Sequence, residues 1–190
     1  KYSAMRRINA MGKQILFLLF ICSIFIVQAE ENRVIVGAER TAEYYPLLEG
    51  KRVAVFSNHT GYPSFYFDDY TEKMPSYIAD VLVGEGLNVV TIFSPEHGFR
   101  GNADAGEHVS GSIDPKTGIK ISSLYDGKSG RPSDESMRMF DVLVVDIQDV
   151  GLRFYTYYIS MVKLMDACAE HGRMVIVLDR PNPNGHYIDG

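Results

Sequence analysis

Four short apolar runs, each followed at once by polar residues, limit what this chain can fold into. Runs of four or five residues rich in Val, Ile and Leu are typical of strands buried on both faces of a parallel sheet. The predicted strands are residues 52–56, 89–93, 142–145 and 174–178, with a further short strand within 119–124. Helices are predicted over 41–48 and 77–83, from Ser133 onward, and along a face marked by Ile159, Val162 and Met165. This alternation predicts an α/β fold, a parallel sheet with helices on both faces.

The polar residues that end the predicted strands are expected to meet. In a parallel sheet all carboxyl ends lie at one edge, where open α/β folds bind their ligands. The side chains expected there are Asn58 and His59, then Glu96 and His97, then Asp146, Gln148 and Asp149, then Asp179, Arg180 and Asn182. The sequence therefore predicts one polar cleft at this edge.

The segment Ser94–Gly98 lies directly after the second predicted strand. Pro95 cannot continue the ladder of sheet hydrogen bonds, and Gly98 lets the backbone turn. Glu96 and His97 are therefore expected on a tight turn, as a candidate general acid/base pair.

The sequence gives little support to several other function classes. No glycine-rich phosphate loop follows a strand, and no Gly-x-Ser-x-Gly motif presents a nucleophilic serine. The formal net charge is −5, which argues against nucleic acid as a partner because nucleic-acid binding needs a basic face. No cofactor is expected. Cys168 lies in an apolar helical pattern and is expected to be a small core residue.

The first 29 residues have the pattern of a secretory signal peptide. Basic residues precede an apolar stretch over 15–27, and Ala29 ends a small-residue cleavage site. We therefore expect residues 1–29 to direct secretion, with no other membrane contact, and residues 30–190 to form the folded domain.

Three interpretations of the predicted cleft are compatible with its residues. In the first, Glu96 is a general acid/base and Asp146 or Asp149 is a second carboxylate, as in glycoside hydrolysis. Such pairs lie ~5–5.5 Å apart in retaining enzymes and ~6.5–9.5 Å apart in inverting ones. Tyr155 and Tyr157 would suit a sugar face, and a substrate carboxylate would suit Arg153 or Arg180.

The second interpretation is a divalent metal held by Glu96, His97, Asp146 and Asp149, although no HExxH-type spacing supports it. The third is structural. Aspartates at strand ends often cap the following helix, and Arg153 would then pair with one of them.

Four separated motifs carry a resemblance to a known family. They are FSPEHGFRG at 93–101, DAGE at 104–107, DVLVVDIQDVG with RFYTY over 141–157, and LDRPNP at 178–183. In this order they resemble the NamZ-type exo-β-N-acetylmuramidases, glycoside hydrolase family 171. The resemblance runs from about Arg52 to the end of the chain.

The resemblance implies a Rossmann-like catalytic domain over 30–190, followed in the family by a smaller C-terminal domain that we expect to lie outside this sequence. It also implies release of terminal N-acetylmuramic acid from the non-reducing end of peptidoglycan fragments. A secretory signal would place such a protein in the periplasm or cell envelope of a bacterium. The alternative is a non-catalytic muropeptide-binding or envelope scaffold protein.

The residues and the resemblance together give a candidate site without a metal. The family's catalytic glutamate falls on Glu96. The expected catalytic residues are Glu96, His97, Asp146 and Asp149, and the expected substrate contacts are Asn58, Arg100, Gln148, Arg153, Tyr155, Tyr157, Arg180 and Asn182.

Overall fold

The computed structural model describes residues 34–63, 76–95, 98–100, 112–124 and 130–186. The helices and strands named below lie in the compact unit of residues 36–190, one of two units into which the chain divides. The predicted signal peptide lies outside the described residues, and so do Glu96 and His97. In the described part of the chain, no helix has the length and apolar character needed to cross a bilayer.

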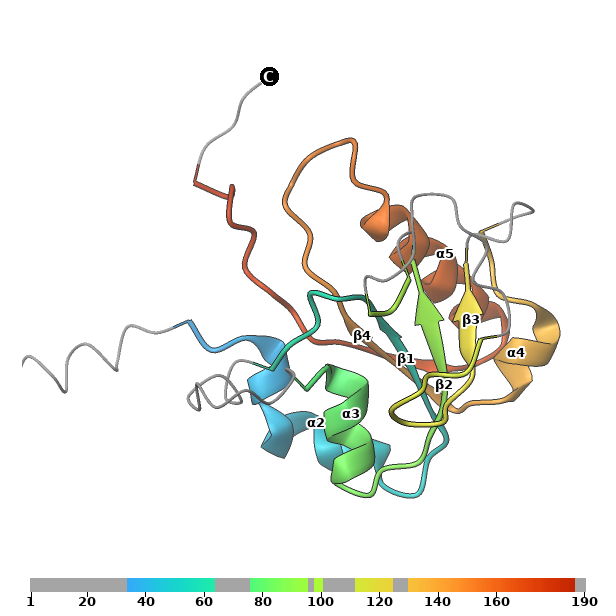
Figure 1. Ribbon diagram of the computed structural model, residues 1–190. Helices are drawn as coiled ribbons and strands as arrows, with labels where there is room; N and C mark the ends of the chain where they lie inside the picture. The colour runs from blue at the N-terminus through green and yellow to red at the C-terminus, as the bar shows by residue number, and fades with distance from the viewer. Residues whose placement is uncertain (1–33, 64–75, 96–97, 101–111, 125–129, 187–190) are drawn as a thin grey trace, which may run out of the picture. The chain divides into compact units, whose positions relative to one another are not determined.

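Within the described residues, five parallel strands form one sheet in the order β3-β2-β1-β4-β5 (Figure 1). The strands are β1 Val53–Ser57, β2 Val89–Ser94, β3 Ile121–Ser123, β4 Val142–Asp146 and β5 Met174–Val177. This sheet confirms the predicted α/β fold, which is Rossmann-like. The four main strands agree with their predicted bounds to within one residue at either end.

The central strand β1 lies between β2 and β4. Val53 is paired with Val89 on one side and with Val142 on the other. From β1 the chain crosses to β2 and then β3, and it later returns past β1 to form β4 and then β5. The direction of winding therefore changes between β1 and β4, the position at which doubly wound sheets bind their ligands.

Helices cover both faces of this sheet (Figure 1). They are α2 Thr41–Leu48, α3 Ile78–Gly84, α4 Asp134–Arg138 and α5 Tyr157–Glu170, and a 3₁₀ turn, η1 Gly37–Glu39, precedes them. Helix α2 has the predicted bounds. Ser133 caps α4 as predicted, because its hydroxyl oxygen accepts the backbone N–H of Ser136 at 3.2 Å.

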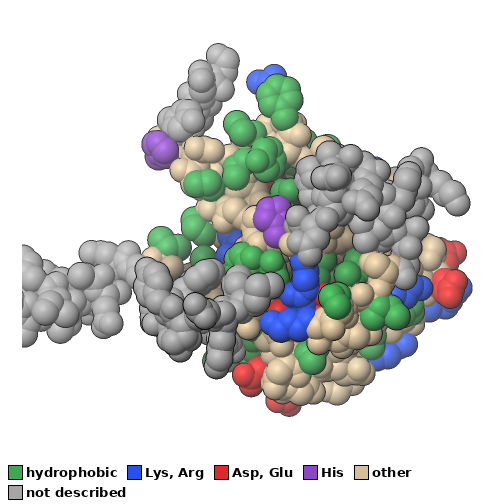
Figure 2. Space-filling view, viewed as in Figure 1, with side chains coloured by type: hydrophobic (Ala, Val, Ile, Leu, Met, Phe, Trp, Pro, Cys, Tyr) green, Lys and Arg blue, Asp and Glu red, His purple; other side chains and the backbone are tan. Residues whose placement is uncertain are grey.

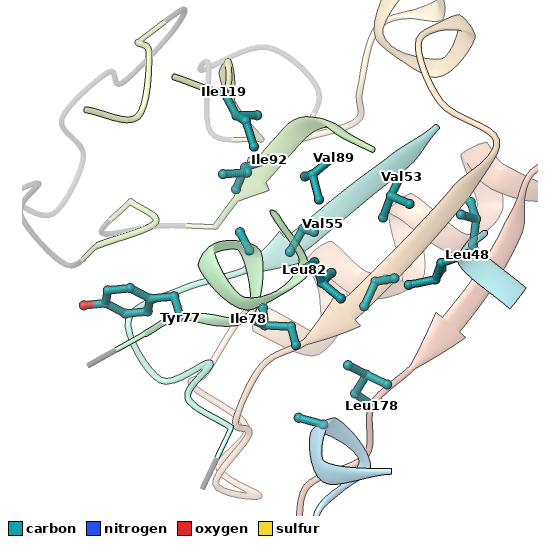
Figure 3. Close-up of a cluster of buried hydrophobic side chains, with 14 of the residues drawn as sticks. Leu48, Val53, Val55, Tyr77, Ile78, Leu82, Val89, Ile92, Ile119 and Leu178 are labelled. Atoms are coloured by element: carbon teal, nitrogen blue, oxygen red, sulfur yellow. The ribbon is translucent and has the colours of Figure 1, made fainter. Parts of the chain in front are cut away.

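Two apolar clusters pack the helices against the sheet. Along β1, Val53 and Val55 point to one face, and Ala54 and Phe56 point to the other. Figure 3 shows the first cluster, in which side chains of α2 and α3, among them Leu48, Ile78 and Leu82, lie over Val53, Val55, Val89 and Ile92. The second cluster joins α4 and α5 to the sheet through Phe56, Phe93, Met137, Phe140, Leu143 and Leu164.

Helix α5 faces the sheet with a side different from the one that the sequence suggested. Ile159, Val162 and Met165 are each about 40–50% exposed. The buried residues are Tyr157, Ser160, Leu164, Ala167 and Cys168. The two stripes are both compatible with helical spacing, and the small residues Ser160, Ala167 and Cys168 let α5 approach the strands closely. As predicted, Cys168 is a buried core residue, and burial raises the pKa of its thiol to about 11.

Candidate active site

The carboxyl edge, by which we mean the edge of the sheet where the strands end, brings together segments that are far apart in the sequence. Ser57, the last residue of β1, is paired with Asp146, the last residue of β4. On the other side of β1, Phe56 is paired with Phe93, one residue before the end of β2. The polar residues after β1, β2 and β4 therefore start from neighbouring positions, as the parallel sheet predicted.

The segment after β1 is fixed by a chain of hydrogen bonds to the segment after β4. The backbone N–H of Gln148 donates to the Thr60 hydroxyl oxygen at 3.2 Å. The Thr60 hydroxyl donates to Asn58 Oδ1 at 2.6 Å, and the Thr60 backbone N–H donates to the same oxygen at 3.0 Å. The last bond makes an Asx turn, which the Asn-x-Thr pattern favours. At Gly61, a side chain would overlap Ser57 and approach Asp146, so glycine lets these segments pack closely.

The segment after β2 is fixed on both sides of Glu96 and His97. Ser94 and Pro95 are buried, and so are Gly98 and Phe99. The Gly98 backbone N–H donates to the Pro95 carbonyl at 3.2 Å, and Gly98 adopts a φ of 75°, in the left-handed region that favours glycine. The described residues thus hold the two ends of the predicted turn within the core. The two residues between them lie outside the description.

Arg100 lies in a network of charges beside this turn. Its Nε and Nη2 donate to Asp114 at 2.5 and 2.7 Å, and its Nη1 and Nη2 donate to Asp80 at 3.2 and 2.8 Å. The guanidinium also lies 5.0 Å from the ring centres of Tyr77 and Phe99. Arg100 was expected to contact substrate. In the structure its donors bind two carboxylates, and it ties the end of the turn to α3.

The carboxyl groups of Asp80 and Asp114 stay ionised because of this network. Burial is the largest single influence and opposes ionisation of both groups. The hydrogen bonds and positive charges of Arg100 and Lys116 at Asp80, and the hydrogen bonds from Arg100 and Thr117 with the charge of Arg100 at Asp114, together outweigh it, so that both pKa values lie below the ordinary value. Lys116 adds a second cation, 2.9 Å from Asp80.

Asp146 and Arg180, both expected at the site, bind each other. Arg180 Nε donates to Asp146 Oδ1 at 2.6 Å, and Arg180 Nη2 donates to Oδ2 at 3.0 Å and to the Tyr62 carbonyl at 2.9 Å. Asp146 is 0% exposed. Burial raises the pKa of its carboxyl group, and the guanidinium of Arg180 opposes that rise. This arrangement links the ends of β4 and β5 to the segment after β1.

Gln148 and Asn182 join the segments that follow β4 and β5. Gln148 Nε2 donates to the carbonyl groups of Asp149 and Pro181 at 2.6 and 2.9 Å. Asn182 lies against Gly151 and accepts the Asn184 backbone N–H at 2.9 Å. Both amide side chains thus help to shape the carboxyl edge.

Asp149 differs from Asp146 in having an oxygen available. Its Oδ1 accepts the Gly151 backbone N–H at 2.8 Å. Its Oδ2 is buried and has no hydrogen-bond partner within the described part of the chain. Of the two carboxylates at the end of β4, Asp149 is therefore the one with an oxygen that no described residue binds.

Aromatic side chains lie between β4 and α5. Phe154 is 83% exposed and Tyr155 is 40% exposed, whereas Tyr157 is buried at the start of α5. The rings of Tyr155 and Tyr157 meet edge to face, with their centres 5.6 Å apart. Figure 2 shows hydrophobic side chains gathered at the top of the view, where Figure 1 draws this segment. Arg153 is exposed in the same segment, and so is Phe154, an aromatic residue that is not among the expected substrate contacts.

Buried polar atoms without partners concentrate at the carboxyl edge. Among the described residues, five buried side-chain nitrogen or oxygen atoms have no hydrogen-bond partner. Four of the five belong to residues at the end of a strand or just after it. They are Asn58 and His59 after β1, Ser94 at the end of β2, and Asp149 three positions after β4. Each such atom costs about 1–3 kcal/mol when left unpaired. A polar ligand at this edge would remove that cost.

In the part of the chain that is described, no group of side chains could hold a metal ion. No three His, Cys, Asp or Glu side chains there lie close enough together to hold an ion. Glu96 and His97 of the second interpretation fall outside that part.

Comparison with known proteins gives one consistent family. The model of the N-terminal part of the exo-β-N-acetylmuramidase NamZ matches residues 53–190. The peptidoglycan β-N-acetylmuramidase NamZ of Bacillus subtilis (strain 168) is 40% identical over 149 residues, which are 78% of this chain and 34% of the relative. The chain thus spans about a third of the length of this curated relative.

Two solved structures are similar as well. Both are proteins of the DUF1343 family from Bacteroides fragilis NCTC 9343. One is 55% identical with a TM-score of 0.66, covering 84% of this chain and 38% of the other. The second is 38% identical with a TM-score of 0.64, covering 80% of this chain and 36% of the other.

Proposed function

Because this chain belongs to the family of NamZ-type exo-β-N-acetylmuramidases, we propose that the protein is a secreted glycoside hydrolase. Its proposed substrates are peptidoglycan fragments, from whose non-reducing end it releases terminal N-acetylmuramic acid. The family match supports the peptidoglycan substrate class, and the signal-like residues 1–29 support export to the periplasm or cell envelope.

The observation that carries the proposal is the position of the turn after β2. Pro95 and Gly98 are buried, joined by a hydrogen bond, and next to the end of the central strand. In the sequence, Glu96 is one of the two residues between them, and Pro95 and Gly98 lie at the edge where doubly wound sheets bind their ligands. We assign Glu96 the role of general acid/base, with His97 beside it as a group that tunes Glu96 or holds the substrate.

We assign the second carboxylate to Asp149. The oxygens of Asp146 both accept hydrogen bonds from Arg180, whereas Asp149 Oδ2 has no partner among the described residues. A carboxylate that acts on a sugar or on water needs an oxygen that is not already bound by donors of the protein. Asp146 then supports the site by holding Arg180.

The lactyl carboxylate of muramic acid would bind Arg153. The guanidinium groups of Arg100 and Arg180 are each held by buried carboxylates, whereas Arg153 is exposed after β4. Arginine binds carboxylates through two parallel hydrogen bonds. Tyr155, exposed and close to Arg153 in the sequence, would form the sugar-binding aromatic surface, and the buried ring of Tyr157 packs edge to face against it.

The test is turnover of a chromogenic N-acetyl-β-muramide by the product of the complete gene. Glu96→Gln is expected to lower kcat by about 10²–10⁴-fold, because it removes the transferable proton with almost no change in shape. Glu85→Gln makes the same chemical change at an exposed residue at the end of α3, and it is expected to leave kcat unchanged.

Two outcomes would contradict the proposal in different ways. Unchanged turnover by Glu96→Gln would remove Glu96 from the chemistry. A wild-type protein that binds muropeptides but never releases N-acetylmuramic acid would be a binding or scaffold protein instead.

A further inference from the structure

Hydrogen bonds fix the orientation of the Asn58 side-chain amide, that is, which side carries its oxygen and which its nitrogen. Gln148 donates to the Thr60 hydroxyl oxygen, so the Thr60 hydroxyl proton is free to point to Asn58. Asn58 Oδ1 accepts that proton and the Thr60 backbone N–H, which uses both of its lone pairs. The network therefore assigns the oxygen of the amide to Thr60 and leaves the Nδ2 group on the other side.

The Nδ2 group of Asn58 is buried and has no acceptor among the described residues. Asn58 itself is 0% exposed and directly follows the central strand, next to the point where the winding changes direction. A buried amide with a saturated oxygen and two unused donors is suited to bind an oxygen acceptor of a ligand. The Ser94 hydroxyl, which also lacks a partner among the described residues, lies at the end of the adjacent strand β2.

We propose that Asn58 is a donor-only subsite for an uncharged acceptor oxygen of the substrate, and that Thr60 is the positioning residue that sets its polarity. This proposal rests on the proposed muramidase function and adds the chemistry of one contact. An uncharged acceptor fits better than an anion, because the free Oδ2 of Asp149 lies at the same edge and would repel a negative charge. On a muramic acid residue, such an oxygen belongs to a ring hydroxyl or to the acetamido carbonyl.

The experiment measures binding of N-acetylmuramic acid by calorimetry, together with turnover, in the product of the complete gene. Asn58→Asp keeps the oxygen that Thr60 binds but replaces the donor with a second acceptor. We expect its affinity to fall by about 10- to 100-fold. Thr60→Val, which removes the hydroxyl at constant shape, is expected to weaken binding by about 3- to 10-fold, and Thr60→Ser is expected to restore it.

The ligand series separates the two acceptor groups. If the acetamido carbonyl is the acceptor, wild-type protein binds muramic acid, which lacks the acetyl group, as weakly as Asn58→Asp binds N-acetylmuramic acid. If a ring hydroxyl is the acceptor, loss of the acetyl group leaves the effect of Asn58→Asp unchanged. Either result supports the subsite.

The experiment gives different results if the proposed subsite is wrong and if the proposed function is wrong. Equal affinity of wild type and Asn58→Asp, with both folded by circular dichroism, would overturn the subsite and leave the activity to the test on Glu96. A Thr60→Ser variant as weak as Thr60→Val would overturn the positioning role. Wild-type protein that neither binds N-acetylmuramic acid nor cleaves the substrate would overturn both proposals.

Discussion

Arg180 binds Asp146 through two hydrogen bonds, of 2.6 and 3.0 Å, and so joins the carboxyl ends of β5 and β4. A third hydrogen bond, from the same guanidinium to the Tyr62 carbonyl, adds the segment that follows β1. Three segments that are distant in the sequence thus depend on one buried ion pair at the proposed active site.

Breaking this ion pair is expected to destabilise the fold strongly. Arg180→Met leaves the buried Asp146 without its cation, and such a loss costs about 3–5 kcal/mol of the free energy of unfolding. The double variant Asp146→Leu/Arg180→Met is expected to recover a large part of it, because no buried charge is left. Urea denaturation gives these values. Arg40→Met, which breaks an exposed pair with Glu43, is the control and should cost below about 1 kcal/mol. A cost for Arg180→Met as small as that of the control would disprove this account of the pair.

The two aspartates after β4 are expected to respond differently to the same change. Asp149→Asn keeps an acceptor for the Gly151 N–H, so its unfolding free energy should stay near that of wild type while kcat falls by about 10²–10⁴-fold. Asp146→Asn should instead lower stability, because Arg180 loses its counter-charge. Paired measurements of turnover and unfolding separate the two effects. Turnover by Asp149→Asn within about tenfold of wild type would exclude Asp149 as the second carboxylate.

Arg100→Lys is expected to lower kcat without a matching change in KM. Lysine keeps the charge but cannot bind Asp80 and Asp114 in the same fork, so the end of the turn that carries Glu96 loses its support. A displacement of about 1 Å can cost roughly 10²-fold in rate, and we expect about 10- to 100-fold.

The matched control for Arg100 is Arg52→Lys. Arg52 also forms a two-point pair with an aspartate, Asp141, but at the amino end of β1. It should leave kcat unchanged at a temperature at which both variants are folded. Equal losses of kcat in the two variants would show that only general stability is involved.

Stability is expected to fall in acid through Asp80 and Asp114. Their pKa values lie below the ordinary value in the folded protein, since the contacts with Arg100 at both groups, with Lys116 at Asp80 and with Thr117 at Asp114 together outweigh the large opposing effect of burial. Groups of this kind stabilise the fold above their unfolded pKa of about 4, and that stabilisation disappears as the pH falls through the folded pKa. Between pH 5 and pH 2, the stability of Asp114→Asn should therefore fall less than the stability of wild type. Thermal unfolding at several pH values across that range measures the difference. Parallel curves for the two proteins would contradict this.

Arg153 is expected to make the protein prefer substrates that carry a carboxylate over those that do not. Arg153→Gln should raise KM for an N-acetyl-β-muramide by about 10- to 100-fold, because a hydrogen bond to a charged group is lost. It should leave the lower rate on the matching N-acetyl-β-glucosaminide, which has no carboxylate, unchanged. An equal effect on both substrates would place Arg153 away from the lactyl group.

The sequence predicted the sheet because its apolar runs are too short for helices, are rich in β-branched residues and are each followed by polar residues. It also predicted that polar strand ends would meet, since that follows from parallel pairing alone. It could not say which polar groups bind one another. Arg100 and Arg180 were expected to bind substrate, yet each binds carboxylates of the chain, among them Asp80 and Asp114, which come from distant segments.

Two further features depended on tertiary contacts. The hydroxyl group of Thr60 is held by a hydrogen bond from the backbone N–H of Gln148, 88 positions away in the sequence. No local sequence pattern reveals this contact. The buried side of α5 was selected by how closely small residues such as Ala167 can approach the sheet, and not by which stripe is more apolar.

The central position of β1 also has a consequence for the time course of synthesis. Its second neighbour, β4, begins far along the chain: Arg52 and Asp141, which precede the two strands, are 89 positions apart in the sequence. A ribosome adds that length in about 4–18 s, at about 5–20 residues per second. Throughout that interval one edge of β1 lacks its partner, and the apolar side chains from Val53 to Phe56 are open to chaperones or to another nascent chain. Ribosomal pausing before residue 146 would therefore prolong the stage at which this chain is most prone to aggregate.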